Sequence, residues 1–308
     1  MKNILVVGSL NVDMTIQSDR MPQLGKTMTG FGFSVAAGGK GANQAAAAAM
    51  LGAPVRLLGA VGNDANGKAV LPELSKRGVD CTCVRCLEGP TGVAMIVVVN
   101  GDNCILIDHG ANYALRPESV AAEEAIFDWA DYVVMQLEIP LETVEAAARM
   151  AKAHGAQVIL NPAPMNPLLD GRILQNVDLL IPNEHEAADL VGFALVNEET
   201  AQRAAAEIFK NYGCRVIITL GEKGSLYFDG TKMHMQPAFS VKTVDTTAAG
   251  DSYIGGLCAS LADGEGMEEA MCFATAVSAH VVQRRGALPS LPTRSEAEAQ
   301  KTGMLRVW

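Results

Sequence analysis

The sequence predicts an α/β protein with three αβα layers, in which helices cover both faces of a mostly parallel central sheet, and a small second sheet is attached. From residue 131 onward, short apolar runs alternate with helical segments, and repeated βα units of this kind build a parallel sheet. Earlier in the chain, the apolar runs Val93–Val99 and Cys104–Ile107 flank Asn100-Gly101-Asp102-Asn103, which is a hairpin signal. A hairpin inside a βα pattern is an insertion, and it predicts the separate small sheet.

The central sheet and its helices follow from apolar periodicity and from the glycines that stop helices. Short apolar runs predict buried strands at Ile4–Gly8, Val55–Val61, Tyr132–Gln136, Gln157–Leu160, Leu179–Ile181 and Arg215–Leu220. Helices are expected up to Leu51 and over Ala65–Arg77, Leu141–His154, Glu184–Val191, Glu199–Tyr212, Ser252–Ala262, Met267–Gln283 and Arg294–Gln300. A further hairpin is expected at Ser225–Phe228 and Lys232–Gln236.

The small sheet is expected to contain more than the inserted hairpin. Thr27–Val35 alternates loosely between polar and apolar residues, and the segment near Asp13 is extended if it continues the first strand. We expect both segments to pair with the hairpin. A small sheet with one apolar face must bury that face on an active site or on a second subunit.

Composition and charge are ordinary for a soluble enzyme. The chain has 308 residues, 49% hydrophobic and 19% charged, with a net charge of -10. The acidic balance disfavours nucleic acid and anionic membranes as partners. No apolar run is long enough for a membrane span, and the first one is too short for a signal peptide, so a cytoplasmic protein is expected.

The segment Val244–Tyr253 carries the strongest chemical signal. It passes from β-branched residues through small residues into a predicted helix, and the exposed amides and helix dipole at such a junction bind anions. Asp251 stands beside this anion site. Phosphoryl transfer uses both features, because the amides hold the migrating group while a carboxylate accepts the proton of the attacking hydroxyl. From these residues alone, an aspartate that caps the helix after a flexible turn is an equal alternative.

Two further patterns indicate a ligand with several hydroxyl groups. Asn11 and Asp13 point to the same face if the chain is extended, and an amide beside a carboxylate suits adjacent sugar hydroxyls. An Asx turn after the first strand is the alternative. The loop Ala37–Gln44 is rich in glycine but lacks Walker A spacing, so its glycines favour close backbone approach to a ligand, within reach of Lys40 and Asn43. Taken by itself, this loop is more simply a turn with a solvated lysine.

Ligands of parallel sheets bind beyond the carboxyl ends of the strands. The residues predicted at those ends are Glu138, Asn161, Asn183, Glu186 and Gly221. Asn183 and Glu186 are close to a capping box, and the functional alternative is that they organise water around a magnesium ion.

The cysteines and histidines do not show a metal-binding pattern. Cys81, Cys83 and Cys86 cluster without a fourth ligand nearby, which favours reduced cysteines over a zinc site. The five histidines have no metal-ligand spacing.

Taken together, these signals resemble the ribokinase (PfkB-type) carbohydrate kinases. The motifs that carry the resemblance are Gly8-Ser9-Leu10-Asn11-Val12-Asp13, Gly38-Gly39-Lys40-Gly41-Ala42-Asn43-Gln44, Asn161-Pro162-Ala163-Pro164, Pro182-Asn183-Glu184 with Glu186, and Asp245-Thr246-Thr247-Ala248-Ala249-Gly250-Asp251. The resemblance runs to about Pro292. It implies a single ribokinase-like α/β domain over residues 1–308, with lid strands inserted at about 12–36 and 91–108.

The resemblance implies ATP-dependent phosphorylation of D-ribose at its 5-hydroxyl. Asp251 is similar to the catalytic base of the family, with the amides of Ala248, Ala249 and Gly250 as the anion hole. The implied sugar-binding residues are Asn11, Asp13, Gly39, Lys40, Asn43, Glu138 and Asp251. The implied ATP-binding residues are Asn183, Thr219, Gly221, Glu222, Lys223, Gly224, Gly250 and Thr275.

The resemblance also implies two cations and a second subunit. Glu186 is similar to the glutamate that holds Mg²⁺ through water. The loop for an activating K⁺ is implied at Asp245, Thr247, Val281, Arg284, Gly286 and Ser290. The lid is implied to pair two chains into a homodimer.

One departure and several alternatives bear on the substrate. Ser252-Tyr253-Ile254 follows Asp251 where ribokinases often carry Thr-Phe-Asn, so Ile254 is a position where sugar preference or rate can change. Few basic and few aromatic residues in the lid disfavour phosphosugars and nucleosides. Kinases for 2-deoxyribose, fructose, another hexose or a nucleoside remain alternatives, as does a non-catalytic sugar-binding regulator on the same fold.

Overall fold

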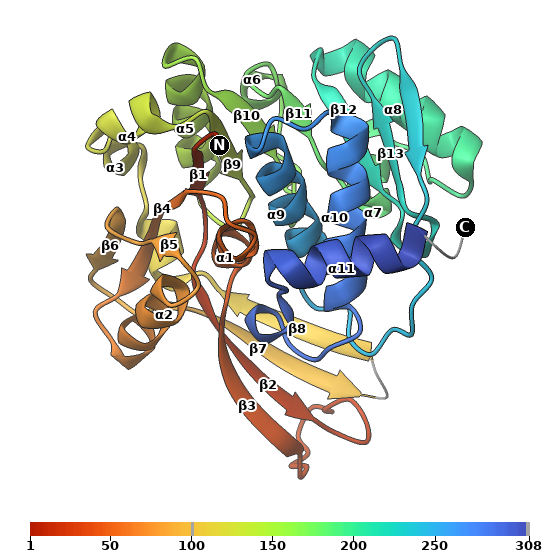
Figure 1. Cartoon of the computed structure of the whole chain (residues 1–308). Coiled ribbons are helices and arrows are strands. Elements are labelled where there is room, and N and C mark those ends of the chain that lie inside the picture. Colours follow the sequence, from red (N-terminus) through yellow and green to blue (C-terminus); the bar gives the residue numbers. More distant parts are fainter. Residues whose placement is uncertain (100–101, 306–308) are drawn as a thin grey trace.

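The computed structural model describes residues 1–99 and 102–305 (Figure 1). The strands of the central sheet are β1 (Ile4–Val7), β4 (Val55–Gly62), β5 (Val79–Asp80), β6 (Val84–Leu87), β9 (Tyr132–Met135), β10 (Gln157–Leu160), β11 (Leu179–Leu180), β12 (Arg215–Thr219), β13 (Ser225–Phe228) and β14 (Met233–Gln236). Their order is β14-β13-β12-β11-β10-β9-β1-β4-β5, and β6 pairs with β4. All neighbours pair in parallel except β12 with β13 and β13 with β14.

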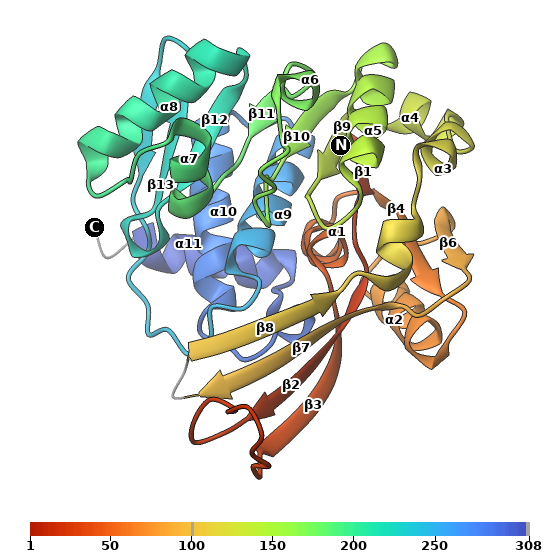
Figure 2. The same ribbon diagram turned by 180° about the vertical axis from the view of Figure 1, so that it is seen from behind.

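Helices cover both faces of this sheet, which confirms the three-layer prediction. The α-helices are α1 (Lys40–Met50), α2 (Ala65–Ser75), α3 (Pro117–Ala121), α4 (Ala125–Trp129), α5 (Leu141–Ala153), α6 (Gly171–Leu174), α7 (Glu184–Val191), α8 (Glu198–Tyr212), α9 (Ala249–Ala262), α10 (Met267–Val281) and α11 (Arg294–Leu305). Three short 3₁₀ helices are η1 (Gly110–Ala114), η2 (Gly221–Lys223) and η3 (Leu288–Ser290). Figure 1 shows α1, α9 and α10 on one face, and Figure 2 shows α5, α7 and α8 on the other.

Strand β1 shows why its short apolar run is central to the fold. Ile4 and Val6 enter the core that contains α1, α9 and α10, whereas Leu5 and Val7 enter the core that contains α5 and α8. All four side chains are buried. A strand of a parallel sheet that is covered on both faces must be apolar at every position, as this one is.

The second sheet, here called the lid, consists of β2 (Asn11–Gln17), β3 (Phe31–Gly38), β7 (Gly92–Val99) and β8 (Asp102–Asp108), in the order β3-β2-β7-β8. The predicted pairing of the inserted hairpin with the two extended segments is therefore confirmed. The strand predicted at Thr27–Val35 is shifted and runs from Phe31 to Gly38, because its pairing partner β2 aligns Asn11 with Gly38. The predicted turn residues Asn100 and Gly101 lie outside the described residues.

One helix begins earlier than its sequence pattern predicts. The helix expected at Ser252 starts at Ala249, so Gly250 and Asp251 lie in the first turn of α9 rather than in a loop. Ala248 precedes the helix with φ 58°, a left-handed conformation that is uncommon for a residue with a side chain. The chain turns sharply at Ala248 and enters the helix at once, which a run of small residues does not reveal.

The described residues also bear on metals and membranes. Cys81, Cys83 and Cys86 lie at or between β5 and β6, and the cysteines of the described ranges are free. Within residues 1–99 and 102–305, no three His, Cys, Asp or Glu side chains are grouped to hold a metal ion. None of the helices in this part of the chain combines the length and apolar character needed to span a membrane.

Candidate active site

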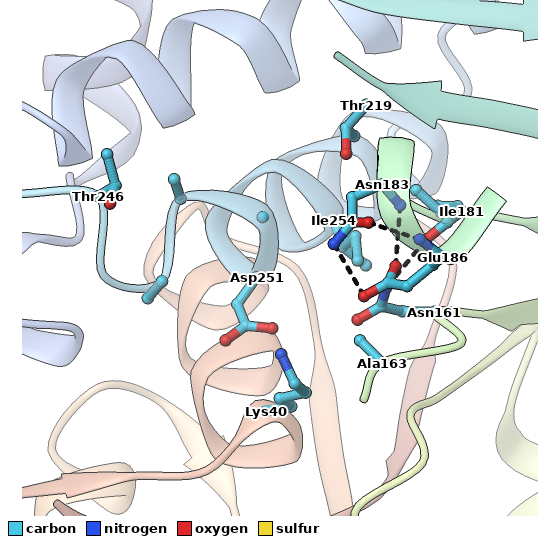
Figure 3. A pocket seen from close by; sticks show the side chains of 13 residues that line it. Lys40, Asn161, Ala163, Ile181, Asn183, Glu186, Thr219, Thr246, Asp251 and Ile254 are labelled. Carbon is cyan, nitrogen blue, oxygen red and sulfur yellow. Dashed lines mark hydrogen bonds between the residues drawn. The ribbon is translucent and has the colours of Figure 1, made fainter. Parts of the chain in front are cut away.

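A cavity of about 230 Å³ opens at the carboxyl ends of β10, β11 and β12, opposite the beginning of α9 (Figure 3). It is lined by Lys40, Asn161, Ala163, Ile181, Asn183, Glu186, Thr219, Thr246, Ala248, Ala249, Gly250, Asp251 and Ile254. In Figure 3 the Lys40 side chain is directed toward Asp251, and Asn183 and Glu186 occupy the other wall. The cavity lies where ligands of parallel sheets bind.

The first turn of α9 supplies free amides to this cavity. No side chain caps the helix, and in the described ranges the amides of Ala248 and Gly250 donate to no backbone carbonyl. The Ala249 amide differs, since it donates to the Thr246 carbonyl at 3.1 Å. Unpaired amides at a helix N-terminus attract anions. The amides of Ala248 and Gly250 are therefore the free donors of the predicted anion hole. The Ala249 amide, which was also predicted there, is already bonded to the Thr246 carbonyl.

Asp251 is held by two neighbouring side chains of α1. Asn43 Nδ2 donates to Oδ2 and Gln44 Nε2 donates to Oδ1, each at 3.0 Å. The aspartate is buried, with 7% of its surface exposed. Both carboxylate oxygens are thus oriented by α1. Gln44 lies in the glycine-rich motif but was assigned no function from the sequence, because only the fold brings it to Asp251.

Glu138 organises the side of the site next to the lid. Its Oε2 accepts hydrogen bonds from Ser9 Oγ at 2.6 Å, from the Lys40 amide at 3.1 Å and from Asn11 Nδ2 at 3.4 Å. Asn112 donates to Asn11 Oδ1 at 2.8 Å. These residues are buried except Lys40, which is partly exposed. Ser9 and Asn112 were not predicted, and Asn112 carries no local signal because it lies 101 residues after Asn11 in the chain.

Asp13 lies on β2 opposite the glycine-rich segment. A Cβ atom at Gly38 would lie 2.2 Å from Asp13 Oδ2, so the glycine leaves room for the carboxylate. Burial, with the charges of Glu138 and Asp251 adding to it, raises the pKa of Asp13 to about 7. Asp13 therefore holds a proton more readily than an ordinary aspartate, because it is buried and faces the charges of Glu138 and Asp251.

The other glycines of this segment approach the chain's own backbone. A Cβ atom at Gly39 would lie 2.8 Å from the Asn11 nitrogen, and one at Gly41 would lie 2.5 Å from the Ser9 nitrogen. Gly39 also has φ 93°, which favours glycine. The sequence predicted close approach to a ligand, but these two glycines approach the chain's own backbone and seat the N-terminus of α1 against the chain between β1 and β2.

Lys40 lies between the two halves of the site. Burial lowers the pKa of its ammonium group, but the negative charges of Asp251, Glu138 and Glu186 outweigh burial and raise the pKa. Lys40 therefore stays protonated and supplies a positive charge in the cavity.

The opposite wall is built by a capping box. Asn183 Oδ1 accepts from the amides of His185 and Glu186 at 2.9 Å, and Glu186 Oε2 accepts from the Asn183 amide at 2.8 Å. The helix-capping role that the sequence offered as the alternative to a magnesium site is thus present. Both side chains also line the cavity, together with Thr219. Burial raises the pKa of Glu186, so a cation beside it would stabilise its ionised form.

The remaining residues of the predicted ATP set lie outside this cavity lining. Gly221 and Gly224 form the η2 turn with φ 56° and 106°, as a glycine turn after a strand requires. Lys223 pairs with Glu184 at 3.6 Å and borders a second cavity of about 210 Å³. Thr275 is buried on α10, where its hydroxyl donates to the Met271 carbonyl at 2.8 Å. Glu222 lies in the same η2 turn.

Asp245 brings together two other residues of the predicted potassium loop, Thr247 and Gly286. Its Oδ1 accepts from the Thr247 amide at 2.9 Å and hydroxyl at 2.6 Å, and its Oδ2 accepts from the Gly286 amide at 2.9 Å. Burial raises the pKa of Asp245, but these hydrogen bonds outweigh burial and lower it. An ionised carboxylate beside the Thr247 hydroxyl offers oxygen donors of the kind that hard cations prefer.

The other three residues of this loop, Val281, Arg284 and Ser290, form hydrogen bonds with nearby residues of the chain. The Val281 carbonyl accepts from the Arg284 amide at 3.0 Å, and Arg284 Nη1 donates to the His280 carbonyl at 2.9 Å. Ser290 is buried and donates to the Ala287 carbonyl at 2.7 Å. These bonds close the turn that follows α10, while Asp245 ties that turn to the segment before α9.

The candidate residues divide along the chain. The sugar set lies on β2, on the segment from Gly38 into α1 and at Glu138, whereas the nucleotide set lies after Pro182. The helix α9, with Asp251, lies between the two sets in space.

The chain is similar to known proteins over almost its whole length. Residues 1–294 match the model of the pfkB family carbohydrate kinases. A ribokinase of Schizosaccharomyces pombe is 42% identical over 311 residues, covering 97% of this chain and 97% of that protein. A ribokinase of Haemophilus influenzae is 40% identical over 298 residues, covering 96% of this chain and 97% of the relative. A deoxyribokinase of Salmonella typhimurium is 36% identical over 293 residues, covering 94% and 96%.

A solved structure shows the same similarity at the level of the fold. The structure of an Arabidopsis thaliana ribokinase complexed with ribose and ATP superimposes with a TM-score of 0.91 at 34% identity, covering 97% of this chain and 98% of that one. The three-layer fold with a lid is therefore the ribokinase-like fold, as predicted. The chain belongs to the pfkB family of carbohydrate kinases.

Proposed function

We propose that the protein catalyses the ATP-dependent phosphorylation of D-ribose at the 5-hydroxyl, giving ribose 5-phosphate and ADP. The observation that carries this proposal is the position of Asp251 at the start of α9, where Asn43 and Gln44 hold its carboxylate. Glu138 and its hydrogen-bond partners lie on one side of it, and the wall with Asn183 and Thr219 lies on the other. The similarity to ribokinases over almost the whole chain supports ribose as acceptor and ATP as donor. An ATP-dependent sugar kinase fits a cytoplasmic location.

In this proposal Asp251 acts as the general base. The 5-hydroxyl oxygen attacks the γ-phosphorus of ATP, the bond to the β,γ-bridging oxygen breaks, ADP leaves, and the hydroxyl proton passes to the carboxylate. The amides of Ala248 and Gly250 stabilise charge on the phosphoryl oxygens during transfer. Lys40 places its positive charge on the same side. Asn11, Asp13, Asn43 and Glu138 hold the sugar hydroxyls.

We further propose two cation sites on the same basis. The Glu186 carboxylate lines the cavity and would hold the water shell of Mg²⁺, which would neutralise phosphate charge, while Asn183 orients that carboxylate. The segments of Asp245, Thr247 and Gly286 offer oxygens for an activating K⁺. Their hydrogen bonds tie the chain before Ala248 to the chain after α10, so a cation there would keep the anion-hole turn in place.

The function is tested by measuring ADP release with Mg²⁺ and ATP on D-ribose, 2-deoxyribose, D-fructose and adenosine, each with and without K⁺. We expect turnover selective for ribose and stimulated by K⁺. Selectivity for 2-deoxyribose would instead match the deoxyribokinase relative and direct attention to Ile254, which lines the cavity. ATP binding without turnover on any sugar would favour the regulatory alternative.

Sugar binding is expected to release protons near pH 7. Asp13 is partly protonated there in the sugar-free protein because its pKa is raised to about 7, whereas two sugar hydroxyls donate only to the ionised form. Titration calorimetry in two buffers of different ionisation enthalpy measures the released proton. We expect different heats near pH 7, equal heats well above it, and no difference for Asp13→Asn. Equal heats at pH 7 for the unaltered protein would contradict this role of Asp13.

The same shift has a consequence for stability without sugar. The folded chain binds the Asp13 proton more tightly than the unfolded chain, whose ordinary value is 3.8. The stability it contributes is therefore fully present below pH 3.8 and is lost as the pH rises through about 7. Sugar counteracts this loss because it stabilises the ionised carboxylate.

We also propose that the lid, an insertion into a single domain over residues 1–308, joins two chains into a homodimer. Met14 pairs across the strands with Val35 and Met95, and Met95 pairs with Leu106, so these side chains form one apolar row on the face away from Asp13. Val35, Met95 and Leu106 are 54%, 58% and 70% exposed. Contiguous exposed apolar surface of this kind marks an interface.

Charging this row is expected to produce monomers. Leu106→Glu places a carboxylate at the β8 end of this row, inside the proposed interface, which would leave a buried charge unpaired in a dimer. Light scattering should give the mass of a dimer for the unaltered protein and of a monomer for Leu106→Glu. Leu168→Glu is the matched control, because Leu168 is 73% exposed and lies outside the lid. A Leu106→Glu protein that stays dimeric would place the interface elsewhere.

A further inference from the structure

A chain of amide side chains leads from the interior of the sheet to the Asp251 carboxylate. Gln136, which follows β9, donates from Nε2 to Gln44 Oε1 at 2.7 Å. Gln44 in turn donates from Nε2 to Asp251 Oδ1 at 3.0 Å. Gln136 and Gln44 are at most 1% exposed. Gln136 does not line the cavity, and among the described residues its side-chain hydrogen bond to Gln44 links it to the site.

The direction of this chain follows from the charge at its end. An ionised carboxylate accepts hydrogen bonds and donates none, so Gln44 must present its NH₂ group to Asp251. Its carbonyl then faces Gln136, which must present its own NH₂ group. Asn161 agrees with this order, because its Oδ1 lies 3.4 Å from Gln44 Nε2 while its Nδ2 donates to the Ile181 carbonyl at 2.9 Å.

The last atom of the chain has no partner. Gln136 Oε1 is buried and makes no hydrogen bond within the described ranges. A Cβ atom at Gly8 would lie 2.1 Å from it, so the absence of a side chain at Gly8 gives this oxygen its space. A buried unpaired oxygen costs free energy of folding, and an apolar side chain would avoid that cost. Packing alone therefore does not account for an amide at position 136.

We propose that Gln136 and Gln44 are positioning residues, with Gln136 fixing the amide of Gln44 so that Gln44 holds Asp251 in the orientation that accepts the proton of the sugar hydroxyl. This inference rests on the proposed function of Asp251. The Gln44 amide has two possible orientations, and the NH₂ group of Gln136 selects the one in which Gln44 donates to Asp251. In the other orientation the Gln44 carbonyl faces the carboxylate and repels it.

Gln136→Glu is the informative variant because its effect depends on pH. While the introduced carboxyl group is protonated, its O–H donates to Gln44 Oε1, as the amide does. Once ionised, the introduced carboxylate accepts only, and the nearest donor is the Gln44 NH₂ group, which must then turn away from Asp251. We expect kcat near that of the unaltered protein at low pH and a new alkaline limb in the kcat–pH profile, with the KM values for ribose and ATP within about threefold.

Gln44→Met removes the selected group itself. It keeps the length of the side chain and loses the charge-assisted hydrogen bond to Asp251. We expect kcat to fall roughly tenfold to a hundredfold at neutral pH, with small changes in KM. In the double variant, Gln44→Met with Gln136→Glu, the new alkaline limb should be absent, because position 136 then has no amide to turn.

Gln300→Met is the control variant. It removes another amide whose buried Nε2 has no partner within the described residues, and we expect its kcat–pH profile to match that of the unaltered protein. Folding of every variant is checked by thermal unfolding. The inference is overturned if folded Gln44→Met and Gln136→Glu keep the original kcat–pH profile, or if the alkaline limb persists in the double variant. An unaltered protein that makes no ADP with ribose, or is insensitive to Asp251→Asn, would contradict the proposed function itself.

Discussion

Asp251→Asn is expected to lower turnover by roughly 10²- to 10⁴-fold, the contribution of a general base, while ribose still binds. The substitution removes the carboxylate in the first turn of α9 that we propose as the acceptor of the hydroxyl proton. It also turns one acceptor into an NH₂ group that must face the NH₂ of Asn43 or of Gln44, each of which lies 3.0 Å from the carboxylate. The variant therefore loses both the base and part of its support.

Two measurements separate chemistry from binding in this variant. The rate of ADP release gives kcat, and calorimetry gives the Kd for ribose, which should change far less than kcat because Asn11, Asp13 and Glu138 remain. Asp189→Asn, on the exposed face of α7, controls for the loss of one negative charge. If Asp251→Asn turns over within about threefold of the unaltered protein, another group accepts the proton.

Gly41→Ala is expected to damage both stability and turnover. Alanine is better than glycine in a helix by roughly 1 kcal/mol, which alone would stabilise α1. The new Cβ atom, however, would lie 2.5 Å from the Ser9 nitrogen and 2.6 Å from the Gly8 carbonyl carbon, and neither backbone atom can rotate away. Overpacking costs typically about 1–3 kcal/mol, so the clash outweighs the helix preference.

The clash is expected to lower turnover because α1 carries Asn43 and Gln44, which hold Asp251. If the first turn of α1 moves outward, Asn43 and Gln44 move with it and release Asp251. A displacement of about 1 Å in a positioning element can cost roughly 100-fold in rate. Thermal unfolding and kcat/KM test both effects, and Gly171→Ala is the control because its Cβ atom would meet open space. A Gly41→Ala protein with an unchanged melting temperature and rate would show that α1 is not seated as described.

Local patterns predicted the elements that build the fold. The central strands were found because apolar runs such as Ile4–Val7 are buried on both sides, and the lid strands because a hairpin interrupts the βα order. The pattern found the two-residue strand β11 but missed other short elements. Strand β5 has two residues and α3 and α4 have five each, too few for a period to show.

The candidate site was predicted where its residues belong to motifs and missed where they do not. Asp251 and Glu138 lie at predicted helix and strand ends, and the structure brings both into one site. Gln136 and Asn112 are linked to the site by hydrogen bonds to Gln44 and Asn11, which lie 92 and 101 positions away, and no local pattern encodes such a pair. The start of α9 was misplaced because the left-handed Ala248 looks like any other small residue in the sequence.

The division of the site along the chain has a consequence for how its specificity can be altered. Apart from Asp251, the residues proposed to bind the acceptor end at Glu138, and those proposed for the donor wall begin at Asn183. If this proposed division holds, substitutions that reshape the acceptor pocket can accumulate in the first half of the gene without altering the side chains proposed to bind ATP. Engineering a new acceptor in this scaffold is thus a matter of the segment that ends at Glu138 and of Ile254, with phosphoryl donation left intact.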